Sequence, residues 1–307
     1  MRHRLVAALL AALLLGAGGC TRSPGPAAGA ATPPAATPGA ADDTPVLPAR
    51  AVPAGGYAVG QRTLAVRRGE RQLAVTLWHP RGAAGAAPWP VVLFSHGLGG
   101  VPADYGPLLR RWAAAGLVVA APTYPRTSRG TRLEPLDVLA QPADATAVLD
   151  RVLALDRAAG DPLRGRLDTR RVAAAGHSAG GITTIGLFTT QRDPRLRAGI
   201  VLAGSTLGLS VPYTGRPAPL LFVHGQQDTI ISYATGRAAY DAVPWPKALL
   251  TIPDGDHGQT LRAGRGRTFD AVAEATLAFW HHALYGDPTA AARLRPPAAV
   301  ARLTAAL

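Results

Sequence analysis

Residues 171–181 read Arg-Val-Ala-Ala-Ala-Gly-His-Ser-Ala-Gly-Gly, and this stretch decides the fold. A short apolar run ends in Gly-x-Ser-x-Gly, and small helix-forming residues follow it. The pattern is typical of a buried strand that turns sharply into a helix and exposes a serine at the turn. Gly176 and Gly180 carry no Cβ, so the strand and the helix can approach closely around Ser178. The sequence therefore predicts a nucleophilic serine at the carboxyl edge of a sheet.

Strand and helix signals alternate along the chain, which is typical of a mostly parallel sheet with helices on both faces. The apolar runs predict eight strands, the first two forming an antiparallel pair at one edge: 63–66, 73–78, 90–95, 117–121, 172–176, 198–202, 220–223 and 248–252. The intervening patterns predict helices at 104–115, from 142 to about 155, and at 179–190, 233–242 and 269–285. The longer connection 123–141 follows the fourth strand, so we expect it to form part of the rim of a site.

The composition is rich in arginine, which bears on possible partners. The chain has 307 residues and a formal net charge of +13, and Lys247 is its only lysine. A bias towards Ala, Gly, Pro and Arg accounts for this charge if arginines occupy solvated positions. No arginine-rich run with interleaved aromatic residues is present, so we expect no nucleic-acid partner.

The N-terminus predicts export. A basic start precedes the apolar run Leu5 to Leu15, which is too short to span a bilayer comfortably. Ala17-Gly18-Gly19-Cys20 follows and resembles a bacterial lipobox, in which the cysteine becomes the lipidated first residue. We therefore predict a signal peptide over 1–20, lipidation of Cys20 and a cell-envelope lipoprotein bound to the membrane through this anchor. Ala17 stands where the commonest lipobox has leucine, so ordinary cleavage and secretion remain the alternative.

The rest of the chain divides by composition. Residues 21–55 are rich in Ala and Pro with few large apolar residues, and they predict a disordered tether. Residues 56–287 form one domain that is large enough for a sizeable core. Residues 288–307 predict a C-terminal tail, either a short helix or a frayed end. Because Cys20 is the only cysteine, no intrachain disulfide can form.

Two further residues complete a catalytic pattern with Ser178. A serine nucleophile needs a base, and the base needs an acid that orients it. Asp228 follows the predicted strand 220–223, and His257 follows the predicted strand 248–252. Order and placement after successive strands predict a Ser178–His257–Asp228 triad.

Other carboxylates and histidines fit this chemistry less well. Asp254 is expected to form a turn beside Gly255, and Asp256 adjoins His257, where neighbouring side chains seldom meet at Nδ1. His177 is expected to point away from the serine and to pack or hydrogen-bond, and His224 to be structural. No pair of histidines has metal-ligand spacing with a third ligand nearby, so we expect no metal.

The stretch His96-Gly97-Leu98-Gly99-Gly100 follows the third predicted strand. Acyl transfer develops negative charge on the carbonyl oxygen, and two backbone donors aimed at that oxygen stabilise it. The Ala179 N–H lies at the predicted N-terminus of a helix, where negative charge is favoured. The glycines around Leu98 let its N–H turn inward, so Leu98 and Ala179 are the predicted oxyanion donors.

Residues 94–99, Phe-Ser-His-Gly-Leu-Gly, together with residues 176–181, Gly-His-Ser-Ala-Gly-Gly, resemble the serine carboxyl-ester hydrolases of the α/β-hydrolase superfamily. The nearest groups are the platelet-activating-factor acetylhydrolases, the bacterial polyester hydrolases and the dienelactone-hydrolase-like enzymes. The resemblance covers roughly residues 57–287 and implies an α/β-hydrolase fold with an eight-stranded, mostly parallel sheet. In the acetylhydrolases the leucine of this motif is an oxyanion donor, which implies that role for Leu98.

The chain departs from two of these groups. Polyester hydrolases commonly have a C-terminal disulfide and an aromatic residue after the first glycine of the oxyanion loop, and this chain has neither. Dienelactone hydrolases proper use cysteine where this chain has Ser178. The resemblance therefore favours small esters over polyesters and dienelactones.

These observations predict a serine carboxylic-ester hydrolase that acts through an acyl-enzyme on short or medium acyl esters and needs no cofactor. A lipase, a cutinase-like polyester hydrolase or an amidase on the same triad are alternatives. A tethered binding protein on a hydrolase fold is the non-enzymatic alternative. Such a protein is expected to have lost a triad residue or an oxyanion glycine, and none is missing from the sequence.

Overall fold

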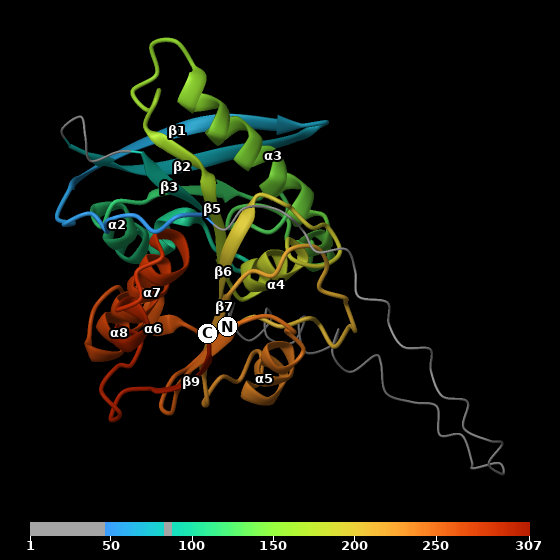
Figure 1. Cartoon of the computed structure of the whole chain (residues 1–307). Helices are drawn as coiled ribbons and strands as arrows, with labels where there is room; N and C mark the ends of the chain where they lie inside the picture. Colours follow the sequence, from blue (N-terminus) through green and yellow to red (C-terminus); the bar gives the residue numbers. More distant parts are fainter. Residues whose placement is uncertain (1–46, 83–87) are drawn as a thin grey trace, which may run out of the picture.

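A computed structural model describes residues 47–82 and 88–307 of the chain. The predicted signal peptide, Cys20 and most of the predicted tether lie outside these residues. The described residues form one nine-stranded sheet with the order β1-β2-β4-β3-β5-β6-β7-β8-β9 (Figure 1). The strands are β1 (Ala58–Arg68), β2 (Arg71–Arg81), β3 (Trp89–Ser95), β4 (Val118–Thr123), β5 (Leu167–His177), β6 (Leu196–Leu202), β7 (Leu220–Gly225), β8 (Lys247–Ile252) and β9 (Arg302–Ala306).

The strands from β4 to β8 pair in parallel, and both edges of the sheet are antiparallel. Figure 1 shows α2, α7 and α8 on one side of the sheet and α3, α4 and α5 on the other. The helices are α2 (Gly106–Ala114), α3 (Gln141–Leu153), α4 (Ala179–Gly186), α5 (Tyr233–Asp241), α6 (Gln259–Ala263), α7 (Arg267–Trp280) and α8 (Ala290–Arg293). Shorter turns are η1 (Pro102–Tyr105), η2 (Pro135–Leu139), η3 (Ala154–Arg157) and the π-helical η4 (His281–Tyr285).

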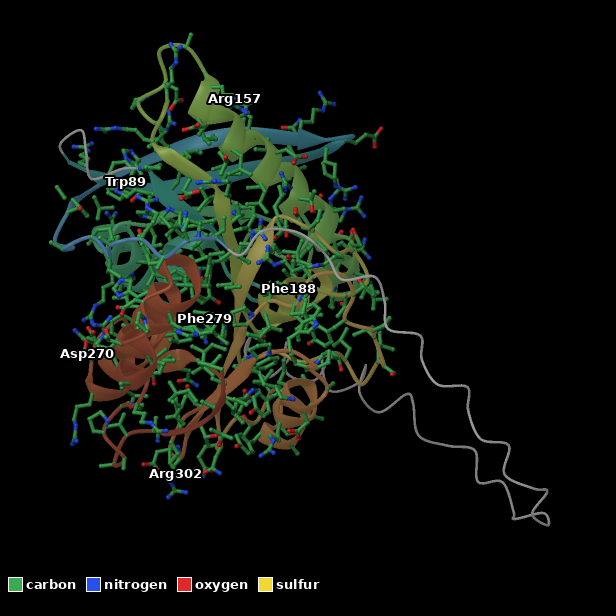
Figure 2. The ribbon with its side chains drawn as sticks, in the orientation of Figure 1. Trp89, Arg157, Phe188, Asp270, Phe279 and Arg302 are labelled. Carbon is green, nitrogen blue, oxygen red and sulfur yellow. The ribbon has the colours of Figure 1, made fainter. Side chains whose placement is uncertain are left out.

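Alternating side chains of each central strand enter two separate cores. Phe94 of β3 belongs to the core that contains Trp112 of α2, whereas Leu93 belongs to the core that contains Val148 of α3. Figure 2 shows Phe279 and Phe188 among the side chains on the two sides of the sheet. A strand buried on both faces has to be apolar throughout, which is why continuous apolar runs identified the parallel strands.

The predicted fold class is confirmed, since a mostly parallel sheet carries helices on both faces. The predicted number of eight strands was one too few within the described residues. The ninth strand, β9, comes from the segment expected to be a tail, and it pairs antiparallel with the free edge of β8. Helix α4 ends at Gly186 rather than at 190, because the chain turns back there and the Gln191 N–H bonds to the Gly186 carbonyl.

No helix in residues 47–82 or 88–307 is both long enough and apolar enough to cross a membrane.

Candidate active site

Ser178 lies on a tight turn between β5 and α4. Its backbone has φ 57° and ψ −120°, a conformation that non-glycine residues rarely adopt. A Cβ on Gly176 would lie 2.1 Å from the carbonyl oxygen of Gly180, and a Cβ on Gly180 would lie 2.0 Å from the carbonyl oxygen of Ser95. Both glycines are therefore required if strand, helix and the neighbouring strand β3 are to meet at this turn.

The structure brings Ser178, His257 and Asp228 together from three loops at the carboxyl edge of the sheet. The Nε2 atom of His257 lies 2.7 Å from Ser178 Oγ, and its Nδ1 atom lies 2.7 Å from Asp228 Oδ2. A carboxylate only accepts hydrogen bonds, so Nδ1 carries a proton. In the neutral ring Nε2 is then free to accept the proton of the serine hydroxyl.

Both carboxylate oxygens of Asp228 have hydrogen-bond partners. Its Oδ1 accepts the backbone N–H groups of Ile230 and Ile231 at 2.8 and 2.9 Å. Its Oδ2 faces His257 and also lies 3.3 Å from Nε2 of His224. Burial alone would raise the pKa of Asp228, but these hydrogen bonds, first those from His224 and His257, lower it well below its usual value. The carboxylate therefore stays ionised and aimed at His257.

The two other carboxylates near His257 do not reach its ring. Oδ1 of Asp256 accepts the backbone N–H groups of Gly258 and Gln259, both at 2.9 Å, and so caps the turn into α6. Asp254 is exposed beside that turn. Of the three aspartates, the geometry brings only Asp228 to Nδ1.

The two predicted oxyanion donors lie beside Ser178. Ala179 is the first residue of α4, where an N–H group has no partner within the helix. Leu98 packs against the small apolar cluster that contains Ala179, and a Cβ on the preceding Gly97 would lie 3.2 Å from Ser178 Cβ. Neither amide donates to a protein acceptor in the part of the chain that the structure describes. The two N–H groups are therefore free to bind a substrate oxygen near the serine.

His96 holds the oxyanion loop in place. Its Nδ1 atom lies 2.8 Å from the Gly97 carbonyl oxygen, and its Nε2 atom lies 3.1 Å from the Tyr124 backbone nitrogen. The carbonyl has to accept and the amide has to donate, so the ring is neutral with its proton on Nδ1. Burial lowers the pKa of His96 in agreement with this state.

A buried chain of hydrogen bonds, which we call the relay, links the oxyanion loop to the loop that carries His257. It runs from Gly97 through Tyr105 to His177. His177 Nε2 lies 2.8 Å from the carbonyl oxygen of His257, so Nε2 donates and the neutral ring accepts at Nδ1. The Tyr105 hydroxyl, 2.8 Å from that Nδ1, donates to it and accepts the Gly97 N–H at 3.2 Å. His177 is a hydrogen-bonding residue, as predicted, but the sequence did not reveal its partners. The relay fixes the backbone on both sides of the serine.

We expect Tyr105→Phe to lower kcat/KM about tenfold to a hundredfold, because a small displacement of His257 or Gly97 misaligns the reacting groups. Tyr285→Phe is the matched control, since Tyr285 also donates one buried hydrogen bond, at 3.1 Å to the Gly116 carbonyl, outside the site. Steady-state kinetics and melting temperatures of both variants test the expectation. Equal losses of activity in the two variants would show that Tyr105 acts only through stability.

The buried neutral histidines predict a pH dependence of stability. Burial lowers the pKa of His96, and lowers that of His177 well below 6.5, so the folded protein binds fewer protons than the unfolded chain. Their contribution is complete above about pH 6.5 and is lost as the pH falls below it, by up to about 1.4 kcal/mol per pH unit for each histidine. Urea unfolding between pH 7.5 and 5 measures this slope, in a range above the usual pKa of the carboxylates. A stability that is constant or rises on acidification would contradict the expectation, and His177→Gln should reduce the slope.

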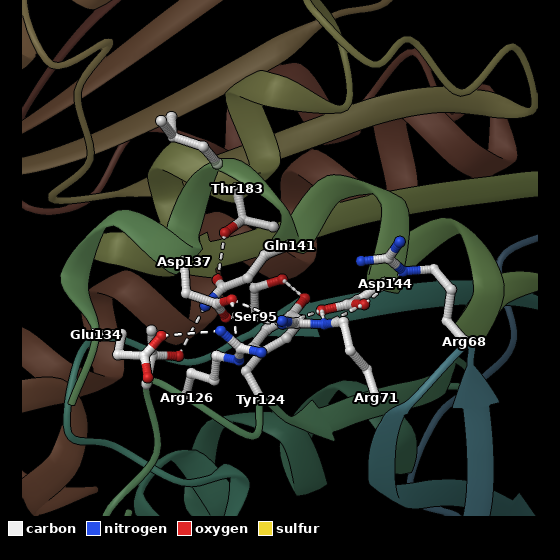
Figure 3. A network of polar contacts seen from close by, with 12 residues as sticks. Arg68, Arg71, Ser95, Tyr124, Arg126, Glu134, Asp137, Gln141, Asp144 and Thr183 are labelled. Atoms are coloured by element: carbon white, nitrogen blue, oxygen red, sulfur yellow. Dashed lines mark hydrogen bonds and ion pairs between the residues drawn. The ribbon is translucent and has the colours of Figure 1, made fainter. Parts of the chain in front are cut away.

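An ion-pair network holds the rim connection against the sheet (Figure 3). Arg71 of β2 lies between Asp137 and Asp144, with contacts of 2.6 Å to each, and Arg68 binds Asp144 at 2.6 Å. Asp144 is fully buried and Asp137 nearly so. The hydrogen bond that Arg71 donates to Asp137 is the main reason that the pKa of Arg71 is raised. The network therefore ties η2 and the start of α3 to the edge of the sheet.

A separate set of hydrogen bonds joins the amide of Gln141 to the helix that follows Ser178. Its Nε2 donates to the Thr127 hydroxyl at 2.7 Å, and its Oε1 accepts from the Thr183 hydroxyl of α4 at 2.7 Å (Figure 3). The rim connection is thus held between the sheet and α4. The sequence predicted that this connection borders the site but did not reveal these contacts.

A cavity of about 930 Å³ opens over Ser178 and His257. Its walls are the oxyanion loop 97–100, part of the rim connection around Arg129, and two residues of α6, Gln259 and Arg262. This volume is in the range of sites for small organic ligands. In residues 47–82 and 88–307, no group of three or more His, Cys, Asp or Glu side chains is placed to hold a metal ion.

Comparison with known proteins identifies two partial relatives and the family of this chain. Two curated relatives are the proteins named "Uncharacterized protein YfhR" from Escherichia coli strain K12 and from Escherichia coli O157:H7. Each is 32% identical over 84 residues, a match that spans 25% of this chain and 30% of the relative. Their names state no activity.

The model of the PET hydrolase-like family matches residues 68–280. This range covers most of the described sheet and includes all three residues of the hydrogen-bonded triad. It confirms the resemblance seen in the motifs around Leu98 and Ser178. The chain belongs to the PET hydrolase-like family, an α/β-hydrolase-type family of ester-acting hydrolases related to the dienelactone-hydrolase-like and acetylhydrolase-like esterases.

Proposed function

We propose that this protein is a serine carboxylic-ester hydrolase that acts through an acyl-enzyme. The observation that carries the proposal is the continuous hydrogen-bonded chain from Ser178 Oγ through His257 to Asp228, with 2.7 Å at each step. This chain lies at the floor of a cavity large enough for a small ester. Membership of a family of ester-acting hydrolases supports the same reaction.

In the proposed reaction His257 Nε2 accepts the proton of Ser178 as Oγ attacks the ester carbonyl carbon. The carbonyl oxygen becomes negatively charged in the tetrahedral intermediate, where the N–H groups of Leu98 and Ala179 stabilise it. His257 then gives its proton to the leaving alcohol, and the acyl group stays on Ser178. Water attacks the acyl-enzyme with His257 again as base, which releases the acid. Asp228 stabilises the imidazolium that forms in both halves.

Short or medium acyl esters are the proposed substrates. The family name makes polyesters the main alternative, but Leu98 stands where polyester hydrolases commonly have an aromatic residue, and the chain cannot form an intrachain disulfide. A panel of 4-nitrophenyl esters from acetate to palmitate, a 4-nitroanilide and a polyester film separates these classes. We expect the highest kcat/KM with the short or medium acyl chains. Faster turnover of the film, the palmitate or the anilide would favour a polyester hydrolase, a lipase or an amidase, and no turnover at all would favour a binding protein.

We also propose that the protein is exported and anchored to the membrane through Cys20. The support is sequence alone: the basic start, the apolar run and the small residues before the only cysteine. Expression of the full chain in a bacterial host should give an acylated protein in the membrane fraction, detected by mass spectrometry of its N-terminal peptide. Cys20→Ser should remove the acylation. Wild-type protein that is cleaved elsewhere and carries no lipid would contradict the anchor.

A further inference from the structure

The charges on the wall of the active-site cavity do not cancel. Asp104 and Arg129 both line it, and they form an ion pair with each other. Arg262 also lines the cavity, and its side chain is exposed. No carboxylate in the described part of the chain pairs with Arg262, whereas Arg129, the other arginine in the cavity wall, is paired with Asp104. One positive charge is therefore left unpaired in the wall of the cavity that contains Ser178.

The position of Arg262 is fixed by its helix. Helix α6 begins two residues after His257, and Leu261 anchors it by packing into the core that contains α7. Gly264 ends the helix in a left-handed conformation with φ 68°. The backbone of Arg262 is therefore held at the wall of the cavity.

The electrostatic influence of this guanidinium extends to the floor of the cavity. Burial raises the pKa of Tyr105 to about 12, and the charge of Arg262 opposes that rise. The same charge adds to the burial that lowers the pKa of His177. Tyr105 and His177 line the same cavity as Arg262, so the charge of Arg262 acts on the cavity that holds Ser178.

We propose that the site prefers esters that carry a negative charge, such as a carboxylate, and that Arg262 binds this charge. The inference rests on the proposed esterase activity and names its substrate class. A carboxylate that enters the cavity gains a partner in Arg262, and the guanidinium can bind both of its oxygens at once. A neutral ester of the same shape lacks this interaction.

The test compares pairs of activated esters that differ in one charge. Mono-4-nitrophenyl adipate and its methyl ester place the charge in the acyl part, and 4-acetoxybenzoate and its methyl ester place it in the alcohol part. The measured quantity is kcat/KM for the anionic ester divided by kcat/KM for the neutral one. We expect Arg262→Gln to lower this ratio about fivefold to tenfold for at least one pair, which corresponds to one partly exposed ion pair. The pair that responds identifies the charged part.

Arg265→Gln is the matched control. Arg265 is exposed in the turn after α6 and does not line the cavity, but its loss changes the net charge equally. We expect this variant to keep the wild-type ratio and Arg262→Lys to keep most of it. An unchanged ratio in Arg262→Gln, or an equal fall in Arg265→Gln, would overturn the inference. Turnover of the neutral esters by the wild type tests the proposed function separately, because the ratio has a meaning only if they are hydrolysed.

Discussion

Ser178→Ala is expected to hydrolyse 4-nitrophenyl esters about 10⁴–10⁶-fold more slowly in kcat than the wild type, because the triad acts as a unit. Without Oγ, no acyl-enzyme can form, and His257 is left to activate water with no positioned nucleophile. The backbone donors at Leu98 and Ala179 remain, so a small residual rate above that of buffer is also expected. Steady-state kinetics with one activated ester measure both effects.

A fluorophosphonate provides the direct test of the nucleophile. It should label the wild type at Ser178 alone, and the site of labelling can be found by peptide mass spectrometry. Ser205→Ala is a suitable control, because Ser205 is also buried near the carboxyl edge of the sheet, and its hydroxyl accepts the Leu207 N–H and contacts no triad residue among the described residues. Labelling of Ser178→Ala at a rate comparable to that of the wild type would remove Ser178 from the mechanism.

The parts of the fold that were predicted correctly are those that local patterns control. The strands β3 and β7 are continuous apolar runs, because both of their faces are buried, and each was recognisable without a partner. Strand β9 was not predicted, because it has no such apolar run. Its residues Arg-Leu-Thr-Ala-Ala are mostly exposed, and the strand exists because β8 offers a free edge to which the chain returns. Such pairing depends on tertiary structure and leaves little trace in composition.

The features of the candidate site likewise differ in whether a local sequence pattern predicts them. Gly176 and Gly180 marked the turn because two close backbone contacts exclude a side chain there. The relay behind the triad had no such signal, because the two partners of His177 lie 72 and 80 residues away in the sequence. The role of Arg262 also depends on structure. In an arginine-rich chain, its place in the wall of the cavity distinguishes it from its neighbours Arg265 and Arg267.

Asp228→Asn is the second substitution with a large expected effect, a loss of up to about 10⁴ in kcat by analogy with the serine-protease triad. The structure gives the reason. Oδ1 of Asp228 accepts the N–H groups of Ile230 and Ile231, so the amide oxygen of asparagine takes that position. The amide NH₂ group then faces His257 Nδ1 and donates to it. The ring therefore carries its proton on Nε2 and cannot accept the proton of Ser178.

Asp254→Asn and Asp256→Asn are the matched controls for this substitution. The oxygen of an asparagine at 256 can still accept from the Gly258 and Gln259 N–H groups, so we expect the turn to persist and kcat to fall by no more than a few-fold. All three variants are to be measured with one activated ester at pH 8, and their melting temperatures compared to exclude unfolding. If Asp228→Asn stayed within a few-fold of the wild type while either control lost most of its activity, the acid would have to be reassigned. A large loss in Asp228→Asn alone, with the fold intact, would show that the tautomer of His257 depends on this carboxylate.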